Sequence, residues 1–301
     1  MRSAPESDFW PVLADRIARA TGRAFVVHRS VPVGGGCINT ACRIEGDGAR
    51  YFVKLNRAAR LGMFEAEAEG LHEMERSAGV RVPRPICPGV HDGRSFLVLE
   101  YLDLGAAGDA RASERLGRQL ATMHRTTRAR FGWHRDNTIG STPQENAESE
   151  DWVAFWRERR LRFQLELAAR NGYGDRLQAR GARLLDAFPA LFDGYRPIPS
   201  LLHGDLWGGN FGVTRDGEPV LFDPATYYGD READLAMTEL FGGFGPRFYA
   251  AYREAFPLDP GYRVRRTLYN LYHILNHLNL FGAGYCGQAE AMIDELLCEL
   301  G

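Results

Sequence analysis

The chain has 301 residues, of which 45% are hydrophobic and 25% charged, an ordinary globular composition with room for one large domain or two smaller ones. A net charge of −2 argues against general attraction to nucleic acid or anionic membranes. No apolar run approaches the ~18 residues of a membrane span, and the N-terminus has Asp and Glu where a signal peptide would be uniformly apolar. We therefore expect a cytoplasmic protein without nucleic-acid or membrane partners.

The first hundred residues predict a helix followed by a β meander with a glycine loop at its first turn. The expected elements, in chain order, are a helix at 8–22, strands at 24–33, 39–45 and 51–55, a helix at 61–77 and a strand at 95–102.

From about residue 105 the periodicity becomes helical. We expect helices at 112–127, 151–170 and 175–188, an irregular loop at 134–151, short strands within 200–223 and further helices at the C-terminus. The arginine-rich stretch at 157–162 is typical of a solvated helix face. This order predicts an α+β fold of two lobes, 1–103 and 104–301, with a ligand cleft between them.

The most informative stretch is LLHGDLWGGNFG at 201–212, because it puts several polar side chains on a glycine-rich segment. Asp205 precedes Asn210 by five residues, the offset of the catalytic loop of protein kinases, where the carboxylate orients an attacking hydroxyl. The alternative is an Asx turn with Asp205 as a helix cap, which requires neither His203 nor a second carboxylate.

A second carboxylate follows from a predicted hairpin. The apolar triplets at 211–213 and 220–222 flank a turn that contains Asp-Gly, a pattern typical of a β-hairpin. The hairpin returns the chain to its start, so Asn210 and Asp223 should lie side by side. Strands ~5 Å apart suit two oxygen ligands that share one Mg²⁺.

The first lobe supplies groups that fit phosphate. Gly34, Gly35 and Gly36 leave backbone N–H groups open to an anion, although a glycine turn without a ligand has the same composition. Lys54 lies within an apolar strand and points away from Val53 and Leu55, so it either meets an anion or lies on an exposed strand face.

The next helix offers a carboxylate for that lysine. Glu67 shares the apolar stripe with Phe64, Leu71 and Met74, whereas Glu65 lies on the other side. A glutamate on the buried stripe needs a partner, so we prefer Glu67 over Glu65 for an ion pair with Lys54.

These features appear in the order expected of a phosphotransferase that uses ATP and Mg²⁺. The strand at 95–102 falls where a hinge would hold adenine through backbone groups near Glu100 and Leu102.

With these residues in place, the chain resembles the fructosamine kinase (ketosamine-3-kinase) family, within the protein-kinase-like superfamily of aminoglycoside phosphotransferases and choline kinases. The resemblance runs through GGGCIN at 34–39, YFVKLN at 51–56, MFEAEAEGL at 63–71, VRVPRP at 80–85, FGWHRDNTIGSTPQEN at 131–146, LLHGDLWGGN at 201–210, FDPATYYGDREADLAM at 222–237, LFGGF at 240–244 and NHLNLFG at 276–282.

The resemblance implies a bilobal kinase fold in which Asp205 is the catalytic base and Asn210 and Asp223 hold the metal. It implies that Lys54 contacts the ATP phosphates and pairs with Glu67, and that Asp234 braces the catalytic loop. Similar enzymes phosphorylate the 3-hydroxyl of a sugar joined to an amine by glycation, and the unstable product releases the amine as a repair step.

Three further positions face the substrate in this interpretation. Trp207 offers a flat face to a sugar ring, or packs to hold the loop. Asn276 and His277 line the substrate side, or belong to an internal hydrogen-bond network.

Cys37 is a redox candidate because it lies on the glycine loop near backbone dipoles that favour a thiolate. We expect its oxidation, as a disulfide between two chains, to lower activity, so the partner state is a monomer or a redox-linked homodimer. The alternative is a loop cysteine without a redox role. Five scattered cysteines without a CxxC pair favour neither a disulfide framework nor a zinc site.

The favoured function is therefore an ATP- and Mg²⁺-dependent kinase of protein-bound or small ketosamines. The alternatives are an aminoglycoside- or choline-type kinase on the same scaffold, and a nucleotide-binding regulatory module without turnover.

Overall fold

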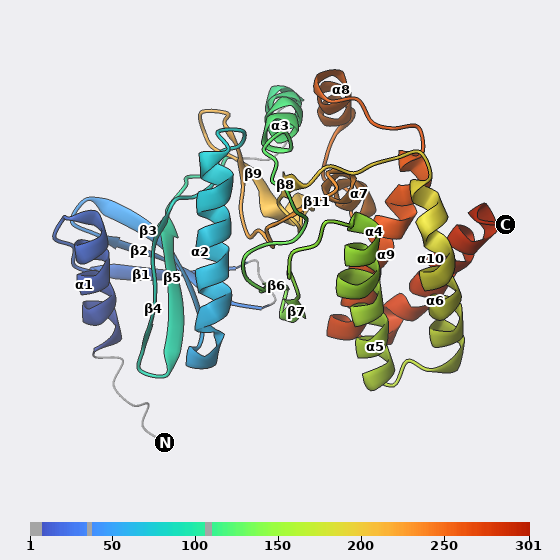
Figure 1. Ribbon diagram of the computed structural model, residues 1–301. Helices are drawn as coiled ribbons and strands as arrows, with labels where there is room; N and C mark the ends of the chain where they lie inside the picture. Colours follow the sequence, from blue (N-terminus) through green and yellow to red (C-terminus); the bar gives the residue numbers. More distant parts are fainter. Residues whose placement is uncertain (1–7, 35–37, 106–109) are drawn as a thin grey trace.

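The computed structural model describes residues 8–34, 38–105 and 110–301. It has a β-rich N-terminal lobe and a mainly helical C-terminal lobe (Figure 1), which confirms the predicted two-lobe α+β class. In these parts of the chain, no helix is both long enough and apolar enough to cross a bilayer.

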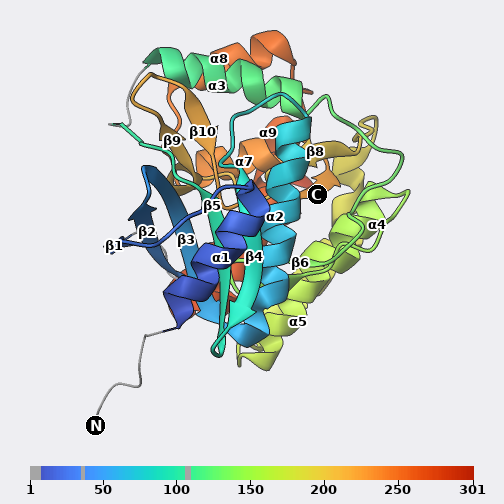
Figure 2. The same ribbon diagram turned by 90° about the vertical axis from the view of Figure 1, so that its left-hand side faces the viewer.

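The N-terminal lobe is a five-stranded antiparallel sheet between two helices (Figures 1 and 2). The strand order is β1-β2-β3-β5-β4. The strands are β1 (Arg29–Val33), β2 (Thr40–Gly46), β3 (Ala49–Arg57), β4 (Pro85–His91) and β5 (Arg94–Glu100), and the helices are α1 (Phe9–Thr21) and α2 (Leu61–Arg76), the latter preceded by a 3₁₀ turn at Ala58–Arg60.

The two faces of β5 explain its continuous apolar sequence. Phe96 and Val98 belong to the core under α1, whereas Leu97 and Leu99 belong to the core that includes α2. Successive side chains of a strand point to opposite faces, so a strand covered on both sides is apolar at every position.

The C-terminal lobe packs its helices around the short strands that carry the polar loop (Figure 1). Its helices are α3 (Ala110–Met123), α4 (Trp152–Trp156), α5 (Phe163–Arg170), α6 (Asp175–Ala187), α7 (Glu232–Leu240), α8 (Pro246–Ala255), α9 (Tyr262–Phe281) and α10 (Cys286–Glu299), with 3₁₀ turns at Phe188–Phe192, Gly208–Asn210 and Ala283–Tyr285. Its strands form three antiparallel pairs: β6 (Asn137–Ile139) with β7 (Thr142–Gln144), β8 (Ser200–Leu202) with β11 (Tyr227–Gly229), and β9 (Phe211–Val213) with β10 (Pro219–Leu221).

The arginine-rich stretch differs from the expectation. Residues Arg157–Arg162 form a π-helical segment that joins α4 to α5, and Arg160 is fully buried. Its guanidinium lies over the rings of Tyr227 and Phe155, and donates to Asn146 Oδ1 at 2.8 Å. The prediction of a wholly solvated face was therefore wrong at this position, because a π-bulge shifts the side-chain period by one residue.

Candidate active site

The polar loop begins where β8 ends, at a backbone turn that only glycine fits. Gly204 has a φ of +82°, and a Cβ there would lie 2.1 Å from the carbonyl oxygen of Ala225. The glycine lets the chain turn sharply away from the buried strand and places Asp205 beside the segment that follows Asp223.

Asp234, in the first turn of α7, holds this turn through its two carboxylate oxygens. They accept from the backbone N–H groups of His203 and Gly204 at 2.7 and 2.8 Å. The predicted bracing contact of Asp234 is therefore present. Although burial alone would raise the pKa of Asp234, hydrogen bonding from His124 keeps it below its ordinary value.

His124 is a supporting residue that the sequence interpretation did not include. It is fully buried, with Nε2 3.1 Å from Asp234 and Nδ1 2.8 Å from the hydroxyl of Tyr252. A signal existed in the sequence, because His124 continues the buried stripe of Leu116 and Leu120 at four-residue spacing. Its partner on α7 could not be predicted from that stripe.

His203 connects the two ends of the site. Its Nδ1 accepts from the N–H of Asp205 at 3.2 Å, so its Nε2 carries the proton and donates to the carbonyl of Phe222 at 3.0 Å. Burial lowers the pKa of His203 and keeps the ring neutral. His203 therefore ties the loop before Asp205 to the strand end before Asp223.

Asp205 and Asn210 are in direct contact. The amide Nδ2 of Asn210 donates to the backbone carbonyl of Asp205 at 2.9 Å and to its Oδ2 at 3.2 Å. Burial and the nearby charge of Asp223 raise the pKa of Asp205 to about 7, against the opposing effect of the Asn210 hydrogen bond. The side chain of Asp205 therefore changes between its protonated and ionised forms near neutral pH.

The predicted hairpin is present and brings Asp223 back to Asn210. Strands β9 and β10 pair antiparallel, and the N–H of Phe222 donates to the carbonyl of Asn210 at 3.1 Å. Asp223 has a φ of +57°, a left-handed conformation that aspartate tolerates better than most residues. The turn directs its carboxylate out of the hairpin and toward the other lobe, where it meets Lys54.

Lys54 joins the two lobes. Its ammonium bonds Glu67 Oε1 at 2.6 Å and also bonds the carboxylate of Asp223. Burial would lower the pKa of Lys54, but the two carboxylates raise it, so the side chain stays cationic. The preference for Glu67 is confirmed, since Glu65 instead lies 3.6 Å from Arg135.

The donor set of Asn210 and Asp223 fits a divalent cation. The Asp223 side chain is 47% exposed. Asn210 uses Nδ2 for its contacts with Asp205 and Asp223, which leaves its amide oxygen as the atom that can act as a ligand. Carboxylate and amide oxygens are the ligands that Mg²⁺ prefers.

The glycine loop connects β1 to β2, as expected, but only its first glycine is described. Gly34 lies in this loop, whereas Gly35, Gly36 and Cys37 fall outside the described residues. The loop exit is tied to β3, because the amide of Asn56 donates to the carbonyl of Ile38 at 3.2 Å.

The expected hinge lies between β5 and the helical lobe. The N–H of Glu100 donates to the carbonyl of Arg84 at 2.8 Å, and its carboxylate bonds Arg81 at 2.6 Å. The N–H and the side chain of Glu100 are therefore both engaged within the protein. Leu102 follows in the extended connection and is partly buried.

The three predicted substrate-side residues have different surroundings. Trp207 is 40% exposed, and its ring covers the backbone of Gly209. His277 is partly exposed and lies 4.8 Å from the ring of Phe241, which in turn lies 6.5 Å from Trp207. Asn276 is buried, and its amide bonds Gln164 and the carbonyl of Ile139, in keeping with the alternative of an internal network.

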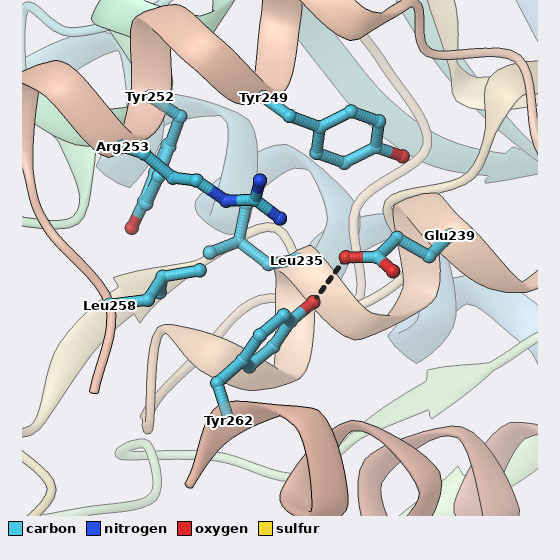
Figure 3. A pocket seen from close by; sticks show the side chains of 7 residues that line it. All are labelled: Leu235, Glu239, Tyr249, Tyr252, Arg253, Leu258 and Tyr262. Atoms are coloured by element: carbon cyan, nitrogen blue, oxygen red, sulfur yellow. Dashed lines mark hydrogen bonds between the residues drawn. The ribbon is translucent and has the colours of Figure 1, made fainter. Parts of the chain in front are cut away.

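A narrow recess with no room for a water molecule lies at the meeting point of α7, α8 and α9 (Figure 3). Its lining is Leu235, Glu239, Tyr249, Tyr252, Arg253, Leu258 and Tyr262. It contains none of the predicted site residues, and Tyr262 closes part of it by donating to Glu239 at 2.7 Å. The chemistry that the sequence indicates therefore lies at the loop between the lobes.

Comparisons with known proteins show the family of the chain. The family model for fructosamine kinases matches residues 9–299. A probable ketoamine kinase of Synechocystis is 48% identical over 292 residues, which cover 96% of this chain and 97% of the relative. The chloroplastic protein-ribulosamine 3-kinase of Arabidopsis thaliana is 45% identical over 280 residues, covering 92% and 85%.

Solved structures give the same result. A putative fructosamine-3-kinase from Thermobifida fusca superposes with a TM-score of 0.83 at 34% identity, covering 95% of this chain and 98% of that one. An aminoglycoside phosphotransferase in a ternary complex with ADP and hygromycin B superposes with a TM-score of 0.61 at 14% identity, covering 97% and 98%, which shows the shared protein-kinase-like fold. The chain belongs to the fructosamine kinase family.

Proposed function

We propose that the protein is an ATP-dependent kinase that phosphorylates the 3-hydroxyl of ketosamines, the fructosamine or ribulosamine adducts of amines or proteins. The observation that carries the proposal is the contact of the Asn210 amide with the carboxylate of Asp205 and with the backbone carbonyl of Asp223, because it brings the expected base close to the two expected metal ligands. The substrate class comes from the relatives, which are named ketoamine kinase and ribulosamine 3-kinase.

In this proposal residues 1–103 hold the nucleotide, and residues 104–301 supply catalysis and the acceptor site. Gly34, Gly35, Gly36 and Lys54 meet the phosphates, Glu67 orients Lys54, and backbone groups of Glu100 and Leu102 meet adenine. Asn210 and Asp223 hold Mg²⁺, which supplies positive charge to the phosphates. We propose that the protein works in the cytoplasm, where ATP is available.

Asp205 then acts on the acceptor. It accepts the proton of the 3-hydroxyl as the oxygen bonds the γ-phosphorus, while the bond from that phosphorus to ADP breaks. The exposed rings of Trp207 and Phe241, with His277, lie on the side of the loop where the sugar and its amine would approach.

The test is mass spectrometry of fructosyl-lysine and ribulosyl-lysine incubated with the protein, ATP and Mg²⁺. We expect an added phosphate followed by loss of the sugar and release of lysine. An Asp205→Asn variant should lower kcat by about 10²- to 10⁴-fold. Phosphorylation of an aminoglycoside or choline instead would support the other kinases of this fold, and nucleotide binding without any turnover would support a regulatory module.

A further inference from the structure

One face of α2 runs along the segment that follows Asp223. Glu67, Gly70 and Glu73 lie three residues apart, so they share that face. Glu67 reaches Asp223 through Lys54, Gly70 packs on Thr226, and Glu73 bonds Tyr228. Helix α2 therefore contacts the segment 223–228 at three successive positions.

The middle contact is a close approach. A Cβ on Gly70 would lie 2.7 Å from the Oγ1 of Thr226 and 3.1 Å from its Cβ, so glycine is required for the helix to lie this near. Any rotation of α2 away from this segment would open that contact.

The last contact is a second buried polar anchor. Glu73 is 8% exposed, and its Oε1 accepts from the hydroxyl of Tyr228 and from Arg128, both at 2.7 Å. The guanidinium of Arg128 also lies over the ring of Tyr228, 4.6 Å from its centre. A buried carboxylate with two such donors holds its position far more firmly than an exposed pair, and it leaves both donors unpaired if it moves.

Helix α2 also shares a buried apolar cluster with the helical lobe, and its remaining polar links to that lobe are weaker. Glu69 bonds His134 at 2.8 Å and also contacts Arg135, but its side chain is 43% exposed. Exposed ion pairs contribute little because water screens them.

We propose that Glu73 is a positioning residue for phosphoryl transfer: it holds α2 against β11, and thereby keeps Glu67 on Lys54. The two glutamates are six residues apart on one rigid helix, about 9 Å along its axis. The anchor and the ion pair therefore move together. This inference rests on the proposed kinase function for the role of Lys54.

The experiment is a double-mutant cycle on kcat for ketosamine phosphorylation. Glu73→Gln keeps the side-chain shape, and Tyr228→Phe removes only the hydroxyl that donates to Glu73. Each is made alone and in a Glu67→Gln background, where the ion pair between residue 67 and Lys54 is absent whatever the position of the helix. Glu75→Gln, at an exposed position on the same helix, is the matched control.

We expect Glu73→Gln alone to lower kcat about 10-fold, and to lower it less than about twofold in the Glu67→Gln background. Tyr228→Phe should follow the same pattern, and Glu75→Gln should leave kcat unchanged. An equal fold-loss in both backgrounds would mean that Glu73 acts through the fold in general, and an unchanged kcat in folded protein would mean that it does not act at all. Either result overturns the proposal. Tyr228→Phe, which loses a single oxygen, carries the test if Glu73→Gln does not fold.

A second readout separates this inference from the proposed function. The affinity for a Mg²⁺-bound, non-hydrolysable ATP analogue should weaken with Glu73→Gln only when Glu67 is present. If the wild-type protein phosphorylates no ketosamine, the proposed acceptor fails, yet this binding cycle still supports or overturns the role of Glu73.

Discussion

At the scale of single residues, the structure places a carboxylate where ionisation is costly. Asp205 is partly buried near the charge of Asp223, and its pKa is raised to about 7. The folded protein therefore holds a proton on Asp205 that the unfolded chain releases near pH 4. Its stability should fall as pH rises through this window, because the folded protein must then carry a partly buried charge on Asp205.

This cost is measurable in an Asp205→Asn variant. Asparagine has no charge to bury, so the melting temperature of the variant should exceed that of the wild type by an amount that grows from pH 4.5 to pH 8. Thermal unfolding followed by circular dichroism at several pH values measures it. Asp186→Asn, at an exposed position on α6, is the control. A constant difference across the range would contradict the raised pKa.

The exposed ring of Trp207 leads to a second prediction. Because the ring covers Gly209 and reaches toward Phe241 on the outer side of the loop, Trp207→Ala should raise the KM for the ketosamine about 10-fold. Nucleotide affinity should change less than about twofold. Steady-state kinetics and a nucleotide titration measure the two, and Trp207→Phe, which keeps a ring, should lose less. Equal weakening of both ligands would assign Trp207 a packing role instead.

At the scale of elements, the sequence predicted the strands and turns that depend on neighbouring residues alone. The β9–β10 hairpin follows from two apolar triplets around an Asp-Gly turn, and it appears within one residue of the expected positions. Strand β4 was not predicted, because Pro85, Pro88 and Gly89 are poor strand residues. They are tolerated here because β4 lies at the edge of the sheet, where fewer backbone donors are needed.

The brace between α7 and the catalytic loop gives the prediction at this scale. An Asp234→Asn side chain can accept from only one of the N–H groups of His203 and Gly204, and its NH₂ group faces the other donor. We expect a loss of about 1–3 kcal/mol in the free energy of unfolding and a lower kcat. Urea denaturation and kinetics measure them. Unchanged stability would show that the carboxylate does not hold the loop.

At the scale of the whole molecule, the site exists because distant segments meet. Lys54 and Asp223 are 169 residues apart in the sequence, and His124 and Asp234 are 110 apart. Local patterns predicted the Glu67–Lys54 pair and the return of Asp223 to Asn210, and the order of the motifs suggested that these two parts of the site converge. These patterns could not predict the His124–Asp234 or Glu73–Tyr228 contacts, since nothing local in either segment specifies its partner.

The same meeting of lobes sets the charge balance of the site. The carboxylate of Asp223 bonds Lys54, the cation expected to meet the ATP phosphates. A divalent cation between Asp223 and the phosphates would remove this competition and the repulsion between two anions. Nucleotide and Mg²⁺ should therefore bind cooperatively.

The most direct test is the ratio of dissociation constants for a non-hydrolysable ATP analogue measured without and with Mg²⁺. We predict that Mg²⁺ tightens binding to the wild-type protein by about 10-fold or more, and that the ratio falls to near one in both Asn210→Ala and Asp223→Asn. The same ratio in the wild type and in both variants would contradict the claim that these two side chains meet to hold the metal.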